Sequence, residues 1–278
     1  MSVTLVTSFS PHGFISYGHR MLESALLHLP KSVRLHVYIE ENPLTLLQSD
    51  LDFSGRRVRV ENLYAIPGGV KDFLAKHGND PKKWGKVPGR KDNFRWAICR
   101  FAHKMYAIFH ASEHCKTDLL VWCDGDTNFF ADVPESFFAE TLPEPYYLNF
   151  LGRGTRYHPE CGWFSMRTTH PRHTEFMQRY IDILRTGSFE REAEWHDSYL
   201  FGELVKQMTA EGKIATWNLS PLAIGPGHPW VKSPLAQFSD HCKGESRKIA
   251  GHSLPKDLID SPRVEPYWQG IRKMEGNK

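Results

Sequence analysis

The chain has 278 residues, of which 40% are hydrophobic and 24% charged, and its formal net charge is +3. These values are ordinary for a globular protein built as one large α/β domain. The mild positive charge is compatible with an anionic ligand but does not require nucleic acid as a partner. No apolar run approaches the ~20 residues that a membrane-spanning helix needs, so we expect no transmembrane segment.

The cysteines point to a reducing compartment. There are five of them, an odd number, scattered along the chain without a Cys-x-x-Cys pair. This pattern supports neither a zinc ribbon nor a disulfide framework and fits free intracellular thiols. The first residues lead directly into a predicted strand rather than a signal peptide. We therefore expect a cytoplasmic protein.

The opening of the chain predicts a βαβ unit. Residues 3–9 and 33–39 are rich in β-branched residues and predict two strands, and the apolar period at 17–29 predicts a helix between them. A unit of this kind normally gives a parallel pair of strands. A third strand is expected at 58–63.

Residues 67–93 change character and predict a basic loop insertion, with room for a helix at 70–77. Glycines and prolines interrupt any hydrophobic period there, and the segment contains seven lysines and arginines but only three aspartates. Two interpretations stay open. The segment is either a solvated insertion or a lid or acceptor-binding loop, because long loops in compact domains are often functional.

The stretch 118–130 combines an apolar run with two carboxylates. Residues 119–122 predict a strand buried on both faces, and Asp124 and Asp126 follow at its carboxyl end. Ligands of open α/β sheets gather at such strand ends. With Gly125 permitting the turn, both carboxylates can hold Mg²⁺ or Mn²⁺, and diphosphate oxygens and water complete the coordination. The alternative is a solvated Asp-Gly-Asp turn.

A helix predicted at 94–111 directly precedes this stretch. Arg100 and Lys104 lie one turn apart on it, so they share a face and could meet a diphosphate. Surface charges at this spacing often have no specific role. Further elements are expected as strands at 146–151, 160–166 and 215–218, a short helix beginning near 133, and helices at 170–185 and 192–208. We find no repeat or linker, so 1–278 is expected to be a single domain.

Six blocks of sequence, in order, carry a family resemblance. Four are residues 4–9, Arg100-Phe-Ala-His-Lys104, Trp122-Cys-Asp124-Gly-Asp126 and His241-Cys-Lys-Gly244-Glu-Ser-Arg247-Lys248. The other two are Glu160-Cys-Gly162 and Trp195-His-Asp197-Ser-Tyr199. Together they resemble the metal-dependent nucleotide-sugar glycosyltransferases of GT-A fold, nearest to the family-eight-like and related bacterial and phage branches. The resemblance implies a Rossmann-like, mixed, mainly parallel sheet flanked by helices.

The resemblance also implies residue roles. Asp124, Asp126 and His241 would bind Mn²⁺ or Mg²⁺, and Asp197 and Glu160 would be the catalytic carboxylates, acting as nucleophile, base or hydroxyl anchor. The residues implied in donor binding are Thr7, Ser8, Arg100, Lys104, Asp124, Gly244, Arg247 and Lys248. The family-eight pattern has lysine where this chain has Arg247, and it continues with Pro-Trp, which this chain lacks. Retention and inversion at the anomeric carbon both stay open.

The implied activity is transfer of a hexose from a nucleotide sugar, UDP-glucose or UDP-galactose, to a hydroxyl acceptor. The acceptor is either a saccharide or a hydroxymethylated base in DNA, for which the basic loop could track phosphates and present stacking aromatics. Candidate acceptor residues are Lys82, Lys83, Trp84, Arg90, Lys91 and His196. Two rival hypotheses are a non-catalytic nucleic-acid-binding protein and a metal-dependent nucleotidyltransferase.

Overall fold

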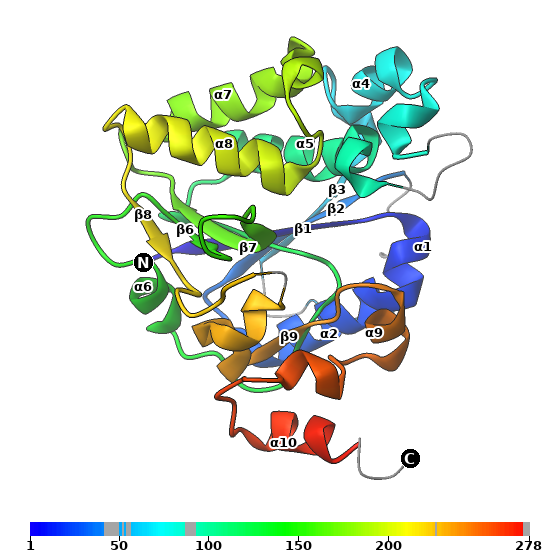
Figure 1. Ribbon diagram of the computed structural model, residues 1–278. Helices are drawn as coiled ribbons and strands as arrows, with labels where there is room; N and C mark the ends of the chain where they lie inside the picture. Colours follow the sequence, from blue (N-terminus) through cyan, green and yellow to red (C-terminus); the bar gives the residue numbers. More distant parts are fainter. Residues whose placement is uncertain (42–49, 52, 54–56, 87–92, 226, 275–278) are drawn as a thin grey trace.

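The computed structural model describes residues 1–41, 50–51, 53, 57–86, 93–225 and 227–274 (Figure 1). Its centre is a seven-stranded sheet of strand order β3-β2-β1-β4-β7-β6-β8. The strands are β1 (Val3–Phe9), β2 (Arg34–Ile39), β3 (Val58–Asn62), β4 (Leu119–Cys123), β6 (Leu148–Leu151), β7 (Glu160–Arg167) and β8 (Thr216–Asn218). A separate two-stranded sheet pairs β5 (Thr127–Phe129) with β9 (Ser239–His241).

The sheet is mixed but mainly parallel. Strands β3, β2, β1 and β4 are parallel to one another, whereas β7 runs antiparallel to both β4 and β6. The last pair, β6 with β8, is parallel again. The expected architecture, a mainly parallel sheet flanked by helices, is therefore confirmed, as is the βαβ opening.

Helices cover both faces of the sheet (Figure 1). They are α1 (Pro11–Gly13), α2 (His19–His28), α4 (Val70–His77), α5 (Ile98–His114), α6 (Phe137–Thr141), α7 (His173–Arg185), α8 (Asp197–Ala210), α9 (Glu245–Ala250) and α10 (Pro266–Lys273). One hydrophobic cluster contains residues of α4, α5, α7 and α8, and a second contains residues of α2, α6 and α10. Strand β4 alternates between them, with Leu120 and Trp122 in the first and Val121 in the second. This alternation explains why all five residues of β4 are buried.

The predicted helices differ from the observed ones mainly at their beginnings. The first helix begins at Pro11 rather than at residue 17, because a π-helical turn, Phe14–Gly18, joins α1 to α2. The helix expected from 94 opens as a 3₁₀ turn, Phe94–Trp96, before α5 begins. The predicted insertion contains α4 and the 3₁₀ turn Pro81–Trp84, so its described part is largely structured. Among the described residues, no helix combines the length and apolar character needed to cross a bilayer.

A buried histidine couples this fold to pH. The imidazole of His173 lies 2.8 Å from Ser112 Oγ and 3.1 Å from the Tyr147 hydroxyl, and burial lowers its pKa from 6.5 to about 4. Well above pH 6.5 the imidazole of His173 is neutral in both the folded and the unfolded protein. Its contribution to stability is therefore lost only as the pH falls through 6.5 toward the pKa of the folded state. At pH 5 this one group should lower the free energy of unfolding by about 2 kcal/mol relative to pH 7.

We therefore expect the variant His173→Gln to lose less stability than the wild type, by about 2 kcal/mol, between pH 7 and pH 5. Urea unfolding at the two pH values measures this difference, and other buried histidines contribute equally to both proteins. The matched control is His12→Gln, which removes an exposed imidazole. Equal pH dependence in wild type and His173→Gln would contradict the assignment.

Candidate active site

The strand pairing brings His241 to the edge of the sheet where Asp124 and Asp126 lie. Asp124 follows β4 directly, and its backbone N–H donates to the carbonyl oxygen of Gly162 on β7 at 2.8 Å. Strand β5 then pairs antiparallel with β9, which sets Thr127 opposite His241. This register places His241 beside Asp126, although 115 residues separate them in the chain.

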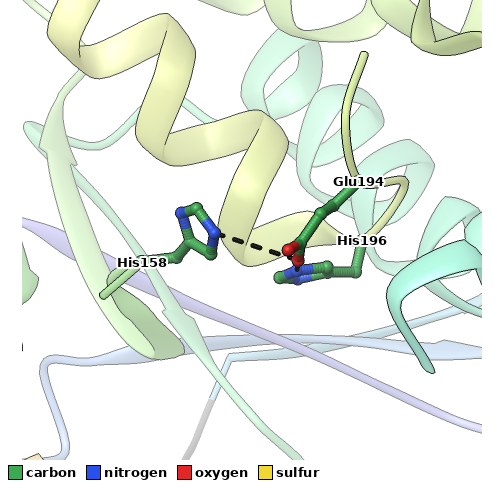
Figure 2. A group of neighbouring side chains, drawn as sticks. All are labelled: His158, Glu194 and His196. Atoms are coloured by element: carbon green, nitrogen blue, oxygen red, sulfur yellow. Dashed lines mark hydrogen bonds and ion pairs between the residues drawn. The ribbon is translucent and has the colours of Figure 1, made fainter. Parts of the chain in front are cut away.

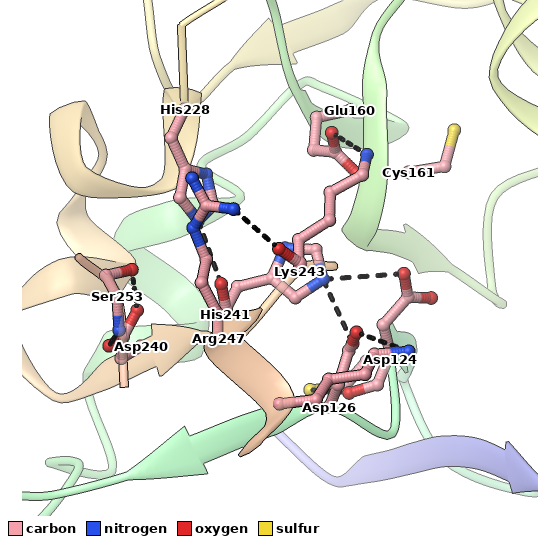
Figure 3. Close-up of polar contacts among 12 residues, drawn as sticks. Asp124, Asp126, Glu160, Cys161, His228, Asp240, His241, Lys243, Arg247 and Ser253 are labelled. Carbon is pink, nitrogen blue, oxygen red and sulfur yellow. Dashed lines mark hydrogen bonds and ion pairs between the residues drawn. The ribbon is translucent and has the colours of Figure 1, made fainter. Parts of the chain in front are cut away.

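Asp124, Asp126 and His241 form a compact triad (Figure 3). One ligand atom from each lies within 4.8 Å of the others. His241 Nε2 is 3.1 Å from Asp126 Oδ1 and 3.7 Å from Asp124 Oδ2. His241 is only 1% exposed, whereas the Asp124 side chain is 29% exposed. The triad thus has a buried nitrogen and a carboxylate that solvent or a ligand can reach.

The chemistry of this triad fits a divalent cation. Two carboxylates and one imidazole nitrogen are suitable ligands for Mn²⁺, and Mg²⁺ accepts the carboxylates. Burial lowers the pKa of His241, but the Asp126 charge raises it above the usual range. Burial conversely raises the pKa of Asp126, but His241 and Lys248 hold it well below its usual range. A proton on His241 therefore compensates the carboxylates, and a cation could take its place.

Lys104 connects the triad to a second carboxylate. Its ammonium group lies 3.0 Å from Asp124 Oδ1 and 2.9 Å from Asp197 Oδ2, and it donates to the carbonyl oxygen of Cys161. Burial lowers the pKa of Lys104, but Asp124 and Asp197 raise it well above the usual value. Asp197 is buried as well, and the same ion pair keeps its pKa low against the effect of burial. Lys104 is thus a fixed positive charge between two carboxylates.

Glu160, at the start of β7, is held by two cations. Lys243 Nζ and an Arg153 guanidinium nitrogen each lie 2.5 Å from its Oε2 (Figure 3 shows the lysine contact). Glu160 is 3% exposed. Burial raises its pKa, but Lys243, His241 and Arg153 hold it far below the usual range. Glu160 therefore stays ionised.

The basic residues after His241 separate into two roles. Lys248 Nζ lies 3.2 Å from Asp126 Oδ2 and 4.3 Å from the centroid of the Tyr17 ring, so it belongs to the triad's surroundings. Arg247 turns away and forms an ion pair with Asp257. Gly244 has a φ of 89° at the start of α9, a conformation that favours glycine. Of Arg247 and Lys248, the structure thus brings only Lys248 to the triad.

The remaining donor-binding candidates differ in their burial and in their contacts. Thr7 is fully buried, and its hydroxyl has no hydrogen-bond partner among the described residues. Ser8 is half-buried at the end of β1. Arg100 is exposed whereas Lys104 is buried, so the two do not present one common face. The contrast arises because Lys104 points inward to its two carboxylates.

The candidate acceptor residues that the structure describes in the basic loop are engaged within the protein. Lys82 Nζ lies 4.5 Å from the centroid of the Trp195 ring, and Lys83 Nζ lies 2.5 Å from Glu190 Oε1. The indole N–H of Trp84 donates to the Gly78 carbonyl oxygen at 2.8 Å. The other two loop candidates, Arg90 and Lys91, lie outside the described residues.

His196, which directly precedes Asp197 in the chain, belongs to a small cluster with Glu194 and His158 (Figure 2). Its Nε2 lies 2.7 Å from Glu194 Oε2, and His158 Nε2 lies 3.8 Å from the same oxygen. His196 Nδ1 accepts the Tyr199 backbone N–H at 3.4 Å and thereby caps α8. With Nδ1 accepting, Nε2 carries the proton and donates to Glu194. His196 therefore positions the helix that begins at Asp197.

Gly125 is required because a side chain at this position would collide with Phe9. The φ angle of Gly125 is not in the left-handed region, so backbone freedom does not explain the glycine as we had expected. A Cβ at this position would instead lie 2.3 Å from Cε1 of Phe9, whose ring also contacts Gly18. The tight approach of β1 to the Asp-Gly-Asp turn therefore depends on a missing side chain.

Three residues that support the site were not predicted. Lys243 binds Glu160, and Gly162 lies against the His241 ring. Asp240 accepts hydrogen bonds from the backbone N–H of Ser253 at 2.6 Å and from the Tyr267 hydroxyl at 2.9 Å, which anchors β9. Lys243 and Gly162 lie within blocks that carry the resemblance, but only the strand pairing shows what they contact.

Replacing Gly162 with alanine should displace His241. The added Cβ would lie 2.6 Å from His241 Cε1, closer than real contacts allow. We expect a loss of about 1–3 kcal/mol in stability from overpacking. Affinity for Mn²⁺ with UDP should fall about tenfold if His241 is a metal ligand, because the added Cβ moves its ring. Chemical denaturation and calorimetry measure the two effects.

The matched control is Gly270→Ala in α10, where a Cβ has nothing within 4 Å. It should leave the affinity unchanged and should not destabilise the protein, because alanine favours a helix over glycine. Unchanged affinity in Gly162→Ala would show that His241 has no part in binding.

The chain is similar to solved structures from which it is remote in sequence. No family model matches the chain, and no curated protein matches it. The chain aligns with mouse Xyloside xylosyltransferase 1, apo form, at a TM-score of 0.47 and 9% identity, over 79% of this chain and 86% of that one. It aligns with the apo form of the glycosyltransferase GlyE from Streptococcus pneumoniae TIGR4 at 0.46 and 12%, over 78% of this chain. That alignment spans 45% of GlyE, which is less than half its length.

Proposed function

We propose that this protein is a metal-dependent glycosyltransferase of GT-A fold. It would move a hexose from UDP-glucose or UDP-galactose to a hydroxyl of a saccharide or of a hydroxymethylated base. The observation that carries the proposal is the triad Asp124, Asp126 and His241 at the carboxyl edge of parallel strands. This edge is where α/β sheets bind nucleotides, and the triad's donor atoms suit the cation that accompanies a diphosphate.

The reaction requires charge stabilisation on the departing nucleoside diphosphate. When bound, the cation would supply part of this positive charge as a Lewis acid. Lys248 would supply another part from its position 3.2 Å from Asp126. Tyr17, whose ring lies under the Lys248 ammonium, would keep that side chain near the triad.

Asp197 and Glu160 would act as ionised groups that bind and orient. Both are buried and held at low pKa by neighbouring cations, Lys104 for Asp197 and Lys243 with Arg153 for Glu160. A carboxylate whose pKa lies far below the working pH is a weak general base. We therefore favour roles in binding hydroxyls and stabilising positive charge at the sugar over removal of a proton.

The test is a donor panel. The protein is incubated with Mn²⁺ and a series of nucleotide sugars without acceptor, and the released nucleotide is identified. A glycosyltransferase should release a nucleoside diphosphate from one donor, and a chelator should stop this release. Pyrophosphate as the product would instead establish a nucleotidyltransferase.

Slow hydrolysis could escape detection, so binding is measured in parallel. Calorimetry with UDP should show binding that requires Mn²⁺. Absence of both turnover and binding would overturn the proposal. Binding of DNA that is steeply salt-dependent and needs no metal would then favour the nucleic-acid-binding hypothesis.

A further inference from the structure

A basic cavity lies beside the triad. It has a volume of about 460 Å³. Its polar lining includes Arg153, His228, Lys232, Lys243, Arg247 and Lys256. None of the three triad residues is among the described residues that line it.

Two contacts connect the cavity to the triad. Lys243 lines the cavity and binds Glu160, whose charge raises the pKa of His241 (Figure 3). His228 also lines it and lies with Nε2 2.9 Å from the His241 carbonyl oxygen. The cavity therefore lies on the Glu160 side of the triad, whereas Lys248 and Tyr17 lie beside Asp126.

The cavity carries unbalanced positive charge. Arg153 and Lys243 share the single carboxylate of Glu160, and Arg247 is paired with Asp257. Lys232 and Lys256 form no ion pair with any residue that the structure describes. The lining thus contributes five cations. The carboxylates of Glu160, Asp257 and Asp260 offset three of them, which leaves a net charge of +2. Arg153 Nε is also buried without a partner among the described residues.

Two aliphatic side chains complete the lining. Ile224 and Ile259 are 82% and 68% exposed, although both line this cavity. Ligand pockets combine apolar side chains with a few placed polar groups, and this lining has both. A cationic wall next to two isoleucines suits a phosphate that is attached to an apolar group better than it suits free phosphate.

We propose that this cavity binds a phosphate group of the acceptor, with Lys232 and Lys256 as its main cationic contacts. Ile224 and Ile259 contact the apolar part next to that phosphate. The acceptor is then a phosphorylated compound whose hydroxyl reaches the triad past Glu160. Naming the ligand as the acceptor rests on the proposed function, whereas anion binding in the cavity does not.

The experiment measures binding without metal, using inorganic phosphate and octyl phosphate as probes. Octyl phosphate should bind wild-type protein more tightly than inorganic phosphate does. The variant Lys232→Gln/Lys256→Gln should bind both at least about tenfold more weakly. The variant Ile224→Ser/Ile259→Ser should lose only the advantage of octyl phosphate.

The matched control is Lys31→Gln/Lys116→Gln. It removes the same charge from two exposed lysines at the opposite edge of the sheet, next to the beginnings of β2 and β4. If the cavity lysines bind phosphate, this control should behave as wild type. The proposal would be overturned if both double variants weakened probe binding equally, or if wild-type protein bound neither probe.

A hydroxymethylated DNA duplex serves as a competitor and identifies the source of the phosphate. Displacement of octyl phosphate by the duplex would assign the cavity to the DNA backbone, and no displacement would assign it to a small phosphorylated acceptor. UDP binding with Mn²⁺ is measured on the same proteins and should not respond to Lys232→Gln/Lys256→Gln. If wild type binds no UDP while the cavity lysines still control phosphate binding, the proposed function fails and the anion site stands.

Discussion

Replacing Asp124 and Asp126 together with alanine is expected to weaken UDP binding in the presence of Mn²⁺ by more than about 100-fold. The variant removes both carboxylates of the triad and leaves His241 as a single neutral ligand, which cannot hold a hard cation. Lys104 keeps its ion pair with Asp197, so its charge does not become isolated. Calorimetry with UDP and Mn²⁺ measures the loss, after thermal unfolding has shown that the variant is folded.

The matched control is Glu23→Ala/Glu113→Ala, which removes two exposed carboxylates from α2 and α5. Its net charge equals that of the Asp124→Ala/Asp126→Ala variant, so a general electrostatic effect on UDP would appear in both. We expect wild-type affinity in this control. Tight, Mn²⁺-dependent binding by the variant lacking both aspartates would exclude the triad as the metal site.

Periodicity and composition were sufficient to predict most of the sheet. Strand β1 has its predicted bounds, and β4 is recognisable because five consecutive buried residues face two hydrophobic clusters. The short strand β9 was not predicted. Its three residues Ser239–His241 are polar, and they form a strand because β5 and the bonds to Asp240 hold them there. Tertiary pairing of this kind leaves no local pattern in the sequence.

The grouping of the candidate triad in space could be predicted from the sequence, whereas the partners of the neighbouring basic residues could not. Asp124, Asp126 and His241 come together as expected, but the sequence could not show that Arg247 pairs with Asp257 while Lys248 reaches Asp126. Adjacent residues at the start of a helix point in directions about 100° apart, so only the docking of α9 decides which one faces the triad. The basic loop illustrates the same limit, because its lysines could not be known to meet Trp195 and Glu190.

The described residues of the candidate site alternate between positive and negative side chains. Lys248 lies beside Asp126, His241 lies beside both aspartates, and Lys104 lies between Asp124 and Asp197. Each buried charge therefore depends on its neighbour, because an unpaired charge in a protein interior is costly. This dependence makes Lys104 important for stability as well as for the site's geometry.

The variant Lys104→Met is expected to lower the free energy of unfolding by about 3–5 kcal/mol. Methionine fills much of the same space, so the loss would arise from charge rather than from a cavity. Asp197, with a side chain only 8% exposed, would lose its ion pair, and Asp124 would lose one of two hydrogen-bond donors. Urea unfolding at neutral pH measures the change.

A second variant separates the ion pair from other consequences of the substitution. In Lys104→Met/Asp197→Asn the buried carboxylate is replaced by a neutral amide, which costs less to bury than an unpaired charge. We therefore expect this double variant to be more stable than Lys104→Met alone, even though it carries one more substitution, and the non-additivity gives the coupling between the two side chains. If Lys104→Met lost less than about 1 kcal/mol, or if Asp197→Asn lowered its stability further, Asp197 would not depend on Lys104 for its charge compensation.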